Sequence, residues 1–245
     1  MKFLGVIPAR YASTRLEGKP LVDIEGHSMI EWVYKRTLLS NLDMVVVATD
    51  DKLVYDEVKS FGGEVIMTSK DHLNGTSRIA EVASVYTDFD VIINVQGDEP
   101  LIEKEMINSL ITPFVEEPNL KMATLKHQMN SLDEVENPNN VKVVTSNDNY
   151  AIYFSRSPIP YPRNLDLNNY FKHVGIYGYR TEFVIEYSKM SPTPLEVSES
   201  LEQLRVLENG YKIKVLDTPY KIIGVDTPED LEKVRKTIRE NNIKL

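Results

Sequence analysis

The sequence of 245 residues predicts an α/β protein with a Rossmann-like, doubly wound and mostly parallel sheet, and with a smaller α+β lobe inserted into it. Two observations support this fold class. Short β-branched apolar runs alternate with amphipathic stretches over the first 115 residues, which is the order of βαβ units. After about residue 120, short strands follow one another with turn residues between them. A chain of this length with 42% hydrophobic residues can form a large packed core.

The first half of the chain carries the parallel pattern. Three continuous apolar runs are typical of strands buried on both faces: Phe3–Ile7, Met44–Ala48 and Val91–Val95. Ser28–Leu39 places its apolar residues on one face of a helix, and Asp51–Phe61 and Arg78–Tyr86 are further predicted helices. We therefore expect strand and helix to alternate four times before residue 115.

The second half follows another pattern. We predict strands at Met122–Lys126, Val141–Thr145, Tyr150–Phe154, Val174–Tyr179, Lys212–Leu216 and Ile222–Val225, and helices at Thr181–Lys189 and Leu195–Glu208. The proline-containing stretch Ser157–Asn169 is predicted to be a surface loop, and a last helix begins after Thr227 with a cap and an early proline. This divides the chain into a sheet domain, residues 1–120 and 205–245, and an inserted lobe, residues 121–204.

Composition excludes several classes of protein. The formal net charge of −9 disfavours general binding to nucleic acid. The absence of cysteine excludes disulfides, iron–sulfur clusters and thiolate zinc sites, and the four histidines lack metal-binding spacing. We expect His27, His72 and His127 to be surface or structural residues. Neither a signal peptide nor an apolar run long enough to cross a membrane is visible, so we expect a soluble cytoplasmic protein without a membrane partner.

The loop after the first predicted strand carries a local positive charge. Residues 8–20 include Arg10, Arg15 and Lys19, together with the Ser13 hydroxyl and backbone amides such as that of Ala9. A loop at the carboxyl end of a strand is where open α/β sheets bind ligands, and these groups suit a polyphosphate. The loop matches neither the Gly-x-x-x-x-Gly-Lys-Ser/Thr nor the Gly-x-Gly-x-x-Gly motif, which disfavours common ATPases and NAD-binding proteins. The alternative is an exposed basic loop.

Two aspartates follow apolar runs. Asp98 comes after Val91–Val95 and Gln96, and Asp226 comes after Ile222–Val225. If both runs are strands of one parallel sheet, the two carboxylates meet at the same edge, where two oxygen ligands and substrate phosphates could hold Mg²⁺. Turn formation by Asp98 and helix capping by Asp226 are the structural alternatives.

Two further polar groups are weaker indications. The stretch Asn74, Gly75, Thr76, Ser77 and Arg78 precedes a helix and suits either an anion or nucleobase, or an ordinary helix cap. In the predicted lobe, polar residues beside apolar segments could recognise hydroxyls and a carboxylate: Arg156, His173, Tyr177, Glu202 and Gln203. A lone histidine such as His173 is more often structural.

These segments, in their order, resemble the CMP-Kdo synthetase family (3-deoxy-manno-octulosonate cytidylyltransferases). In the first half, the matching stretches are Ile7–Arg15 (IPARYASTR), Gly18–Leu21 (GKPL), Val47–Asp50 (VATD), Gly75–Arg78 (GTSR) and Asn94–Pro100 (NVQGDEP). In the second half, they are Met122–Leu125 (MATL), Asn140–Val144 (NVKVV), Tyr153–Arg156 (YFSR), His173–Arg180 (HVGIYGYR), Leu201–Leu207 (LEQLRVL) and Val225–Leu231 (VDTPEDL). The resemblance covers nearly the whole chain.

Two positions depart from the family pattern. Glu17 stands where the family commonly has proline, and Ser77 where it commonly has an acidic or other polar residue. We expect Glu17 to face solvent, although it makes the loop less cationic. Neither departure falls on a matched catalytic position.

The resemblance implies that CTP and the sugar acid Kdo react to give CMP-Kdo and pyrophosphate, with Mg²⁺, for lipopolysaccharide biosynthesis. The implied catalytic residues are Arg10, Lys19, Asp98 and Asp226, of which the two aspartates bind the metal. The implied nucleotide-binding residues are Ala9, Arg10, Ser13, Arg15, Lys19, Asn74, Gly75, Thr76 and Arg78. The implied sugar-acid-binding residues are Arg78, Gln96, Arg156, His173, Tyr177, Glu202 and Gln203. The resemblance further implies a homodimer formed through the inserted lobe.

Other functions remain open at this point. The same chemistry on 8-amino-Kdo or a sialic-type acid would differ in the lobe residues. A nucleotidyltransferase acting on a sugar 1-phosphate would lack a carboxylate-binding arginine there. A non-catalytic nucleotide-binding module would release no pyrophosphate.

Overall fold

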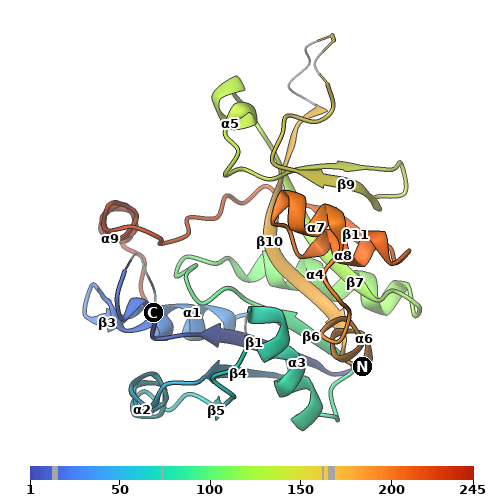
Figure 1. Ribbon diagram of the computed structural model, residues 1–245. Coiled ribbons are helices and arrows are strands. Elements are labelled where there is room, and N and C mark those ends of the chain that lie inside the picture. Colours follow the sequence, from blue (N-terminus) through green and yellow to red (C-terminus); the bar gives the residue numbers. More distant parts are fainter. Residues whose placement is uncertain (13–15, 73, 162, 165–168) are drawn as a thin grey trace.

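A computed structural model describes residues 1–12, 16–72, 74–161, 163–164 and 169–245. Within them, nine strands form a central sheet whose continuous path runs in the order β11-β7-β10-β6-β1-β4-β5, with β8 and β9 attached at β10 (Figure 1). The path strands are β1 (Phe3–Ala9), β4 (Met44–Thr49), β5 (Val65–Met67), β6 (Val91–Asn94), β7 (Met122–Gln128), β10 (Phe171–Arg180) and β11 (Ile213–Asp217). The attached strands are β8 (Lys142–Thr145) and β9 (Ala151–Ser155), and a separate hairpin joins β2 (Asp23–Ile24) to β3 (His27–Ser28).

Most strand pairs on this path are parallel. β1 lies between β4 and β6 and is parallel to both, with Val6 opposite Val46 on one side and Asn94 on the other. β10 alone among the path strands runs against its neighbours β6 and β7. The predicted doubly wound, mostly parallel α/β sheet is therefore confirmed.

Helices cover both faces of the sheet. On one face, apolar side chains of α1 (Met29–Thr37), α2 (Lys52–Ser60) and α4 (Lys104–Glu116) pack on the strands. On the other face pack α3 (Gly75–Val85), α6 (Thr181–Tyr187) and α8 (Gln203–Glu208). The remaining helices are α9 (Pro228–Asn241), which packs on α1, the short α5 (Leu132–Glu136) and α7 (Pro194–Glu199), and the 3-10 turn η1 (Lys19–Leu21). No helix among the described residues is long and apolar enough to cross a membrane.

Two predicted elements are wrong. The stretch predicted as one helix, Leu195–Glu208, forms α7 and α8, because Ser200 adopts a left-handed conformation with φ of 52° and breaks the helix. Ile222–Val225 is not a strand, and within the described residues it pairs with none. It is an extended segment whose Val225 N–H donates to the Asp98 carbonyl at 2.9 Å.

The predicted lobe and the central sheet share strands. β7 and β10 lie between residues 121 and 204, yet they occupy the middle of the sheet and connect β6 to β11. Figure 1 shows that α5, β9 and residues 156–161 project from the sheet. The sheet therefore continues across residue 120, and the division of the chain into two domains stays a prediction.

Candidate active site

The site lies where β1 and β6 end side by side. The chain leaves β1 at Ala9 and β6 at Asn94, and the Val95 N–H still donates to the Val6 carbonyl at 3.0 Å. Two cavities open at this edge, and both are lined by Pro8 and Gln96. The carboxyl edge of a parallel sheet is the usual ligand position in this fold class, so the sequence prediction of its location agrees with the cavities.

The first cavity, about 360 Å³, is the charged cavity. It is lined by Pro8, Ala9, Arg10, Ala12, Lys19, Pro20, Gln96, Gly97, Asp98 and Asp226. The Lys19 ammonium lies between the two carboxylates, 2.6 Å from Asp98 Oδ2 and 2.9 Å from Asp226 Oδ1. The structure thus brings together all four residues that the resemblance names as catalytic.

Lys19 is placed by a tight turn. Gly18 has a φ of 63°, a left-handed conformation that glycine adopts without steric cost, and η1 begins directly after it. The side chain of Lys19 is only 14% exposed. Its ammonium is therefore held in the cavity instead of extending into solvent.

Asp226 reaches the site from a different kind of element than predicted. Its carboxylate comes from the extended segment before α9, which is held against Asp98 by the Val225–Asp98 backbone hydrogen bond. Thr227 caps α9, and its side chain accepts from the Asp230 N–H. The prediction that Asp98 and Asp226 meet is confirmed, whereas the predicted strand is not the cause.

Arg10 presents a free hydrogen-bond donor. Among the described residues, its buried Nη2 has no hydrogen-bond partner. A buried guanidinium nitrogen without a partner is costly, and an anion in the charged cavity would remove that cost. Ser13 and Arg15, the other predicted anion ligands of this loop, lie outside the described residues. Glu17 is exposed, as predicted.

The carboxylate oxygens of this cavity suit a small divalent cation as ligands. The carboxylates of Asp98 and Asp226 already share one cationic partner, Lys19, so they are close enough for a common ion. No group of three or more histidine or acidic side chains suited to a metal occurs in the described part of the chain. Two hard oxygen ligands leave coordination positions for water and phosphate, which is how Mg²⁺ is commonly bound.

Glu99 was not predicted to belong to this site. It follows Asp98, is 8% exposed, and its Oε2 has no hydrogen-bond partner among the described residues. Burial raises the pKa of Glu99 well above its ordinary value, and the neighbouring Asp98 carboxylate raises it further. Burial therefore favours the neutral, protonated form of Glu99, and this burial cannot be recognised in the sequence.

The second cavity, about 230 Å³, is the tyrosine cavity. It is lined by Pro8, Gly75, Thr76, Asn94, Gln96, Met122, Tyr177, Tyr179, Tyr187, Ser200, Leu201, Glu202 and Gln203. The Gln96 amide donates to the Gly175 carbonyl at 2.9 Å. Burial raises the pKa of all three tyrosines, so their hydroxyls remain protonated donors. Glu202 is the one charged side chain among the described residues of this lining.

Sequence reasoning found only part of this cavity. Gly75, Thr76, Gln96, Tyr177, Glu202 and Gln203 were predicted, and the structure brings them together. Asn94, Tyr179 and Tyr187 were missed. The two tyrosines stack on one another, with ring centroids 6.3 Å apart, although Tyr179 lies on β10 and Tyr187 at the end of α6. No local pattern distinguishes such residues from ordinary core tyrosines.

Three predicted ligands of the sugar acid do not line the cavity. The Arg78 side chain is fully buried, with its Nη2 2.7 Å from Asp50 Oδ2 and its Nη1 bonded to Thr68. All three Arg156 guanidinium nitrogens donate to backbone carbonyls, those of Glu199, Pro138 and Ser200. His173 is buried behind Tyr177, with ring centroids 5.3 Å apart.

The other histidines and Asn74 have the structural roles left open by the sequence. The Asn74 side chain accepts from the Ser77 N–H at 2.9 Å and so caps α3. His27 contacts Glu31, and His72 contacts Glu81. His127 Nδ1 lies 3.0 Å from the Gln128 carbonyl, and burial lowers the pKa of its ring.

The site and fold define a class of nucleotide-using transferase, and comparison with known proteins identifies the family. The cytidylyltransferase family model matches residues 4–213, so the chain belongs to the cytidylyltransferase family. Within the class, the chain is similar to proteins named 3-deoxy-manno-octulosonate cytidylyltransferase. The one from Fusobacterium nucleatum is 69% identical over the full length of both chains. The one from Geotalea daltonii is 52% identical, covering 98% of this chain and 99% of its own.

Solved structures agree with this assignment. CMP:2-keto-3-deoxy-manno-octonic acid synthetase, solved in complex with CTP, superposes with a TM-score of 0.94. It is 45% identical, and the match covers 98% of this chain and 100% of that one. A glucose-1-phosphate thymidylyltransferase from Bacillus anthracis shares the fold alone, at 15% identity and a TM-score of 0.70.

Proposed function

We propose that this chain transfers CMP from CTP to Kdo, giving CMP-Kdo and pyrophosphate for lipopolysaccharide biosynthesis. The observation that carries the proposal is the pair of adjoining cavities that share Pro8 and Gln96. One has the cations and carboxylates suited to a nucleoside triphosphate with a divalent ion, and the other has hydroxyl and amide groups suited to a sugar. The names of the similar proteins support the two substrates.

The reaction joins the substrates at the boundary between the cavities. The C2 hydroxyl oxygen of Kdo attacks the α-phosphorus of CTP, an O–P bond forms, and the bond from the α-phosphorus to the bridging oxygen breaks. Pyrophosphate leaves with the electron pair, and the hydroxyl proton passes to solvent. Such transfers depend mainly on positioning and on neutralisation of charge.

Residues of the charged cavity supply that neutralisation. Arg10 would donate its free Nη2 to a phosphate oxygen, and Lys19 would stabilise the charge that develops on the leaving group. Asp98 and Asp226 would hold Mg²⁺, which when bound polarises the phosphate and lowers the pKa of a coordinated hydroxyl. Ser13 and Arg15 would add contacts to the triphosphate, as the family resemblance implies.

Residues of the tyrosine cavity would hold the sugar acid. Gln96 lies at the boundary and would orient the reacting end, while Tyr177, Glu202 and Gln203 would bind hydroxyl groups. We assign Arg78, Arg156 and His173 a supporting role, since the Arg78 Nη atoms, the Arg156 guanidinium and His173 Nε2 contact the protein and not the cavity.

The test is pyrophosphate release with ATP, CTP, GTP and UTP, each with and without Kdo. We expect release only with CTP, Kdo and Mg²⁺ together. Competition by 8-amino-Kdo and a sialic acid then establishes which acid is preferred. Release without any sugar acid, or none under all conditions, would contradict the proposal.

Lys19→Ala tests the charged cavity. We expect turnover to fall by at least about a hundredfold, because a preorganised cation is removed from the site of charge development. Lys236→Ala is the matched control, since Lys236 is an exposed residue of α9 whose side chain is 70% accessible. Near-normal turnover in Lys19→Ala would refute its assignment.

We also propose a homodimer that works in the cytoplasm, where CTP is available. The projecting part of the chain exposes the apolar side chains of Ile152 on β9 and of Tyr161, and α7, whose Glu199 bonds to Ser155 at the end of β9, exposes Leu195 and Val197. Ile152 and Val197 are 62% and 67% exposed. Light scattering should give twice the chain mass of 28.0 kDa, and Ile152→Glu should lower it. A monomer at micromolar concentration would contradict the dimer.

A further inference from the structure

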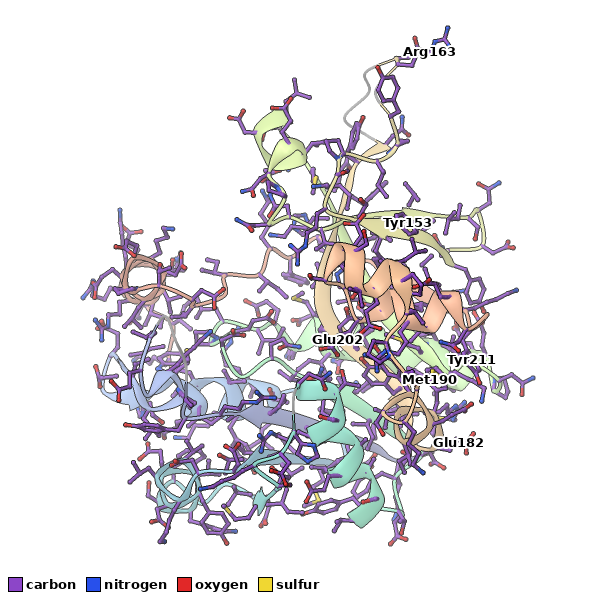
Figure 2. All side chains as sticks on the ribbon, in the orientation of Figure 1. Tyr153, Arg163, Glu182, Met190, Glu202 and Tyr211 are labelled. Carbon is purple, nitrogen blue, oxygen red and sulfur yellow. The ribbon has the colours of Figure 1, made fainter. Side chains whose placement is uncertain are left out.

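Two segments far apart in the sequence meet at the wall of the tyrosine cavity. Thr76 lies in the first turn of α3, Glu202 lies in the turn between α7 and α8, and both line the tyrosine cavity. The Thr76 hydroxyl donates to Glu202 Oε2 at 2.9 Å across 126 positions of the chain. Figure 2 shows Glu202 on the side of α7 and α8 that faces the middle of the molecule.

The turn that carries Glu202 is held firmly from its other side. The Tyr187 hydroxyl donates to the Glu202 carbonyl at 2.6 Å. Arg156 donates to the carbonyls of Glu199 and Ser200, and the Ser155 hydroxyl donates to the Glu199 carboxylate at 2.6 Å. The main chain of the turn is therefore fixed without Thr76, which leaves the Glu202 carboxylate as the part that Thr76 controls.

The Thr76 backbone is fixed as well. Asn74 caps α3 by accepting from the Ser77 N–H, and Thr76 lies between these two residues. The Thr76 hydroxyl thus presents a donor at a defined position, and a bond to a carboxylate is among the stronger hydrogen bonds in proteins. Among the described residues, it is the one hydrogen bond that joins the start of α3 to this turn.

We infer that Thr76 is a positioning residue that aims the Glu202 carboxylate and thereby couples nucleotide binding to sugar-acid binding. The inference rests on the proposed function, in which the nucleotide occupies the charged cavity and Glu202 contacts the sugar. Pro8 lines both cavities, and its Cγ lies 3.7 Å from the Cβ position of Gly75, so the start of α3 packs against the wall of the nucleotide site. A nucleotide that orders the start of α3 also orders the Thr76 hydroxyl, and the aligned carboxylate then binds sugar hydroxyls more tightly. Coupling of this kind is reciprocal between the two ligands.

The experiment measures that coupling by calorimetry. The Kd of Kdo is determined with and without α,β-methylene-CTP, which cannot release pyrophosphate, in the wild type, Thr76→Val and Thr76→Ser. Valine keeps the shape of threonine and removes the hydroxyl, whereas serine keeps the hydroxyl. We expect Thr76→Val to weaken Kdo binding about tenfold in the presence of the analogue, a typical effect of losing a hydrogen bond to a charged group. Thr76→Ser should keep the tighter binding.

A double-mutant cycle gives an independent measurement. If Thr76 acts through Glu202, the KM for Kdo in the Thr76→Val, Glu202→Gln double variant should equal that of the weaker single variant. Independent, additive effects would overturn the inference, as would unchanged coupling in Thr76→Val. Thr237→Val on α9 is the matched control.

Failure of the inference is distinguishable from failure of the proposed function. A wild type that binds neither the CTP analogue nor Kdo would refute the function. A wild type that binds both and couples them, with the same coupling in Thr76→Val, would refute only the role of Thr76. If Thr76→Val does not fold, Thr76→Ala removes the same hydroxyl and takes its place in the cycle with Glu202→Gln.

Discussion

The buried His173 should make the protein measurably sensitive to acid. Its ring lies between Phe154 and Tyr177, and burial lowers the pKa of His173 from 6.5 to about 3. The neighbouring Lys172 ammonium makes a smaller contribution to the same shift. The ring is therefore neutral in the folded protein between pH 5.0 and pH 7.5. The Thr124 hydroxyl donates to the carbonyls of Val174 and Ile176, and its oxygen lies 3.1 Å from His173 Nε2. The Thr124 oxygen therefore accepts a hydrogen bond from the Nε2–H of the neutral ring.

The size of the effect follows from the two pKa values. In the unfolded chain the His173 ring binds a proton below pH 6.5, whereas in the folded chain it does so only near pH 3. Because the folded pKa is depressed, the stability that depends on neutral His173 is present above pH 6.5 and is lost as the pH falls. Between pH 7.5 and pH 5.0 this amounts to about 2 kcal/mol of the free energy of unfolding, at a slope of about 1.4 kcal/mol per pH unit below pH 6.

His173→Gln removes the titration and keeps a donor for Thr124. Urea unfolding of wild type and variant at pH 7.5 and 5.0 gives four free energies of unfolding. We expect the wild type to lose about 2 kcal/mol more than the variant between these pH values, whatever other groups titrate in both. His127→Gln is a graded control, because burial also lowers the pKa of His127 and the same sign is expected. Equal losses in wild type and His173→Gln would refute the reasoning.

Two further predictions concern the charged cavity. Glu99 has a raised folded pKa, so its stabilising contribution is present below pH 4.5 and is lost as the pH rises. Glu99→Gln should therefore lose less stability than wild type in urea unfolding between pH 5 and pH 8, and equal losses would mean that Glu99 is not held neutral. In Gly97→Ala the new Cβ would lie 2.7 Å from the Pro8 carbonyl oxygen. Separating the ends of β1 and β6 should lower turnover at least about tenfold, while Gly224→Ala, with open space around its Cβ, should not; turnover matching Gly224→Ala would contradict this.

The parallel half of the sheet was predictable because its signals are local. A central strand such as β1 is apolar on both faces, and the next helix, α1, turns Ile30, Val33 and Tyr34 to the sheet, so that each pattern lies within about ten residues. The antiparallel β10 was predicted as a strand, but its place between β6 and β7 was not, since it pairs with segments that are distant in the sequence: Tyr177 lies opposite Asn94 of β6, and Phe171 lies opposite Gln128 of β7. The same limit explains why the lobe boundary was drawn through the sheet.

Within the site, residue type predicted chemistry better than it predicted contacts. Arg156 has the charge to bind a carboxylate, but its guanidinium donates to the Glu199 and Ser200 carbonyls at the end of α7. Arg78 likewise forms a salt bridge with Asp50. Asp226 shows the opposite case, because the predicted neighbour was right although the predicted strand was wrong. An extended segment and a paired strand can have the same local sequence, and they differ in whether a neighbouring strand pairs with them. Here the single hydrogen bond from the Val225 N–H to the Asp98 carbonyl holds the segment instead of strand pairing.

The distribution of charge, more than its total, accounts for a substrate that is itself a polyanion. The chain carries −9, yet Lys2, Arg10, Arg15 and Lys19 against Glu17 give the first twenty residues +3. The structure adds that Lys19 is already paired with two carboxylates before any ligand enters. In the proposed reaction, Asp98 and Asp226 would hold a divalent ion in place of Lys19, which would leave the Lys19 ammonium to bind a phosphate. The ion pair of Lys19 would therefore favour a triphosphate that carries a divalent ion over a bare one.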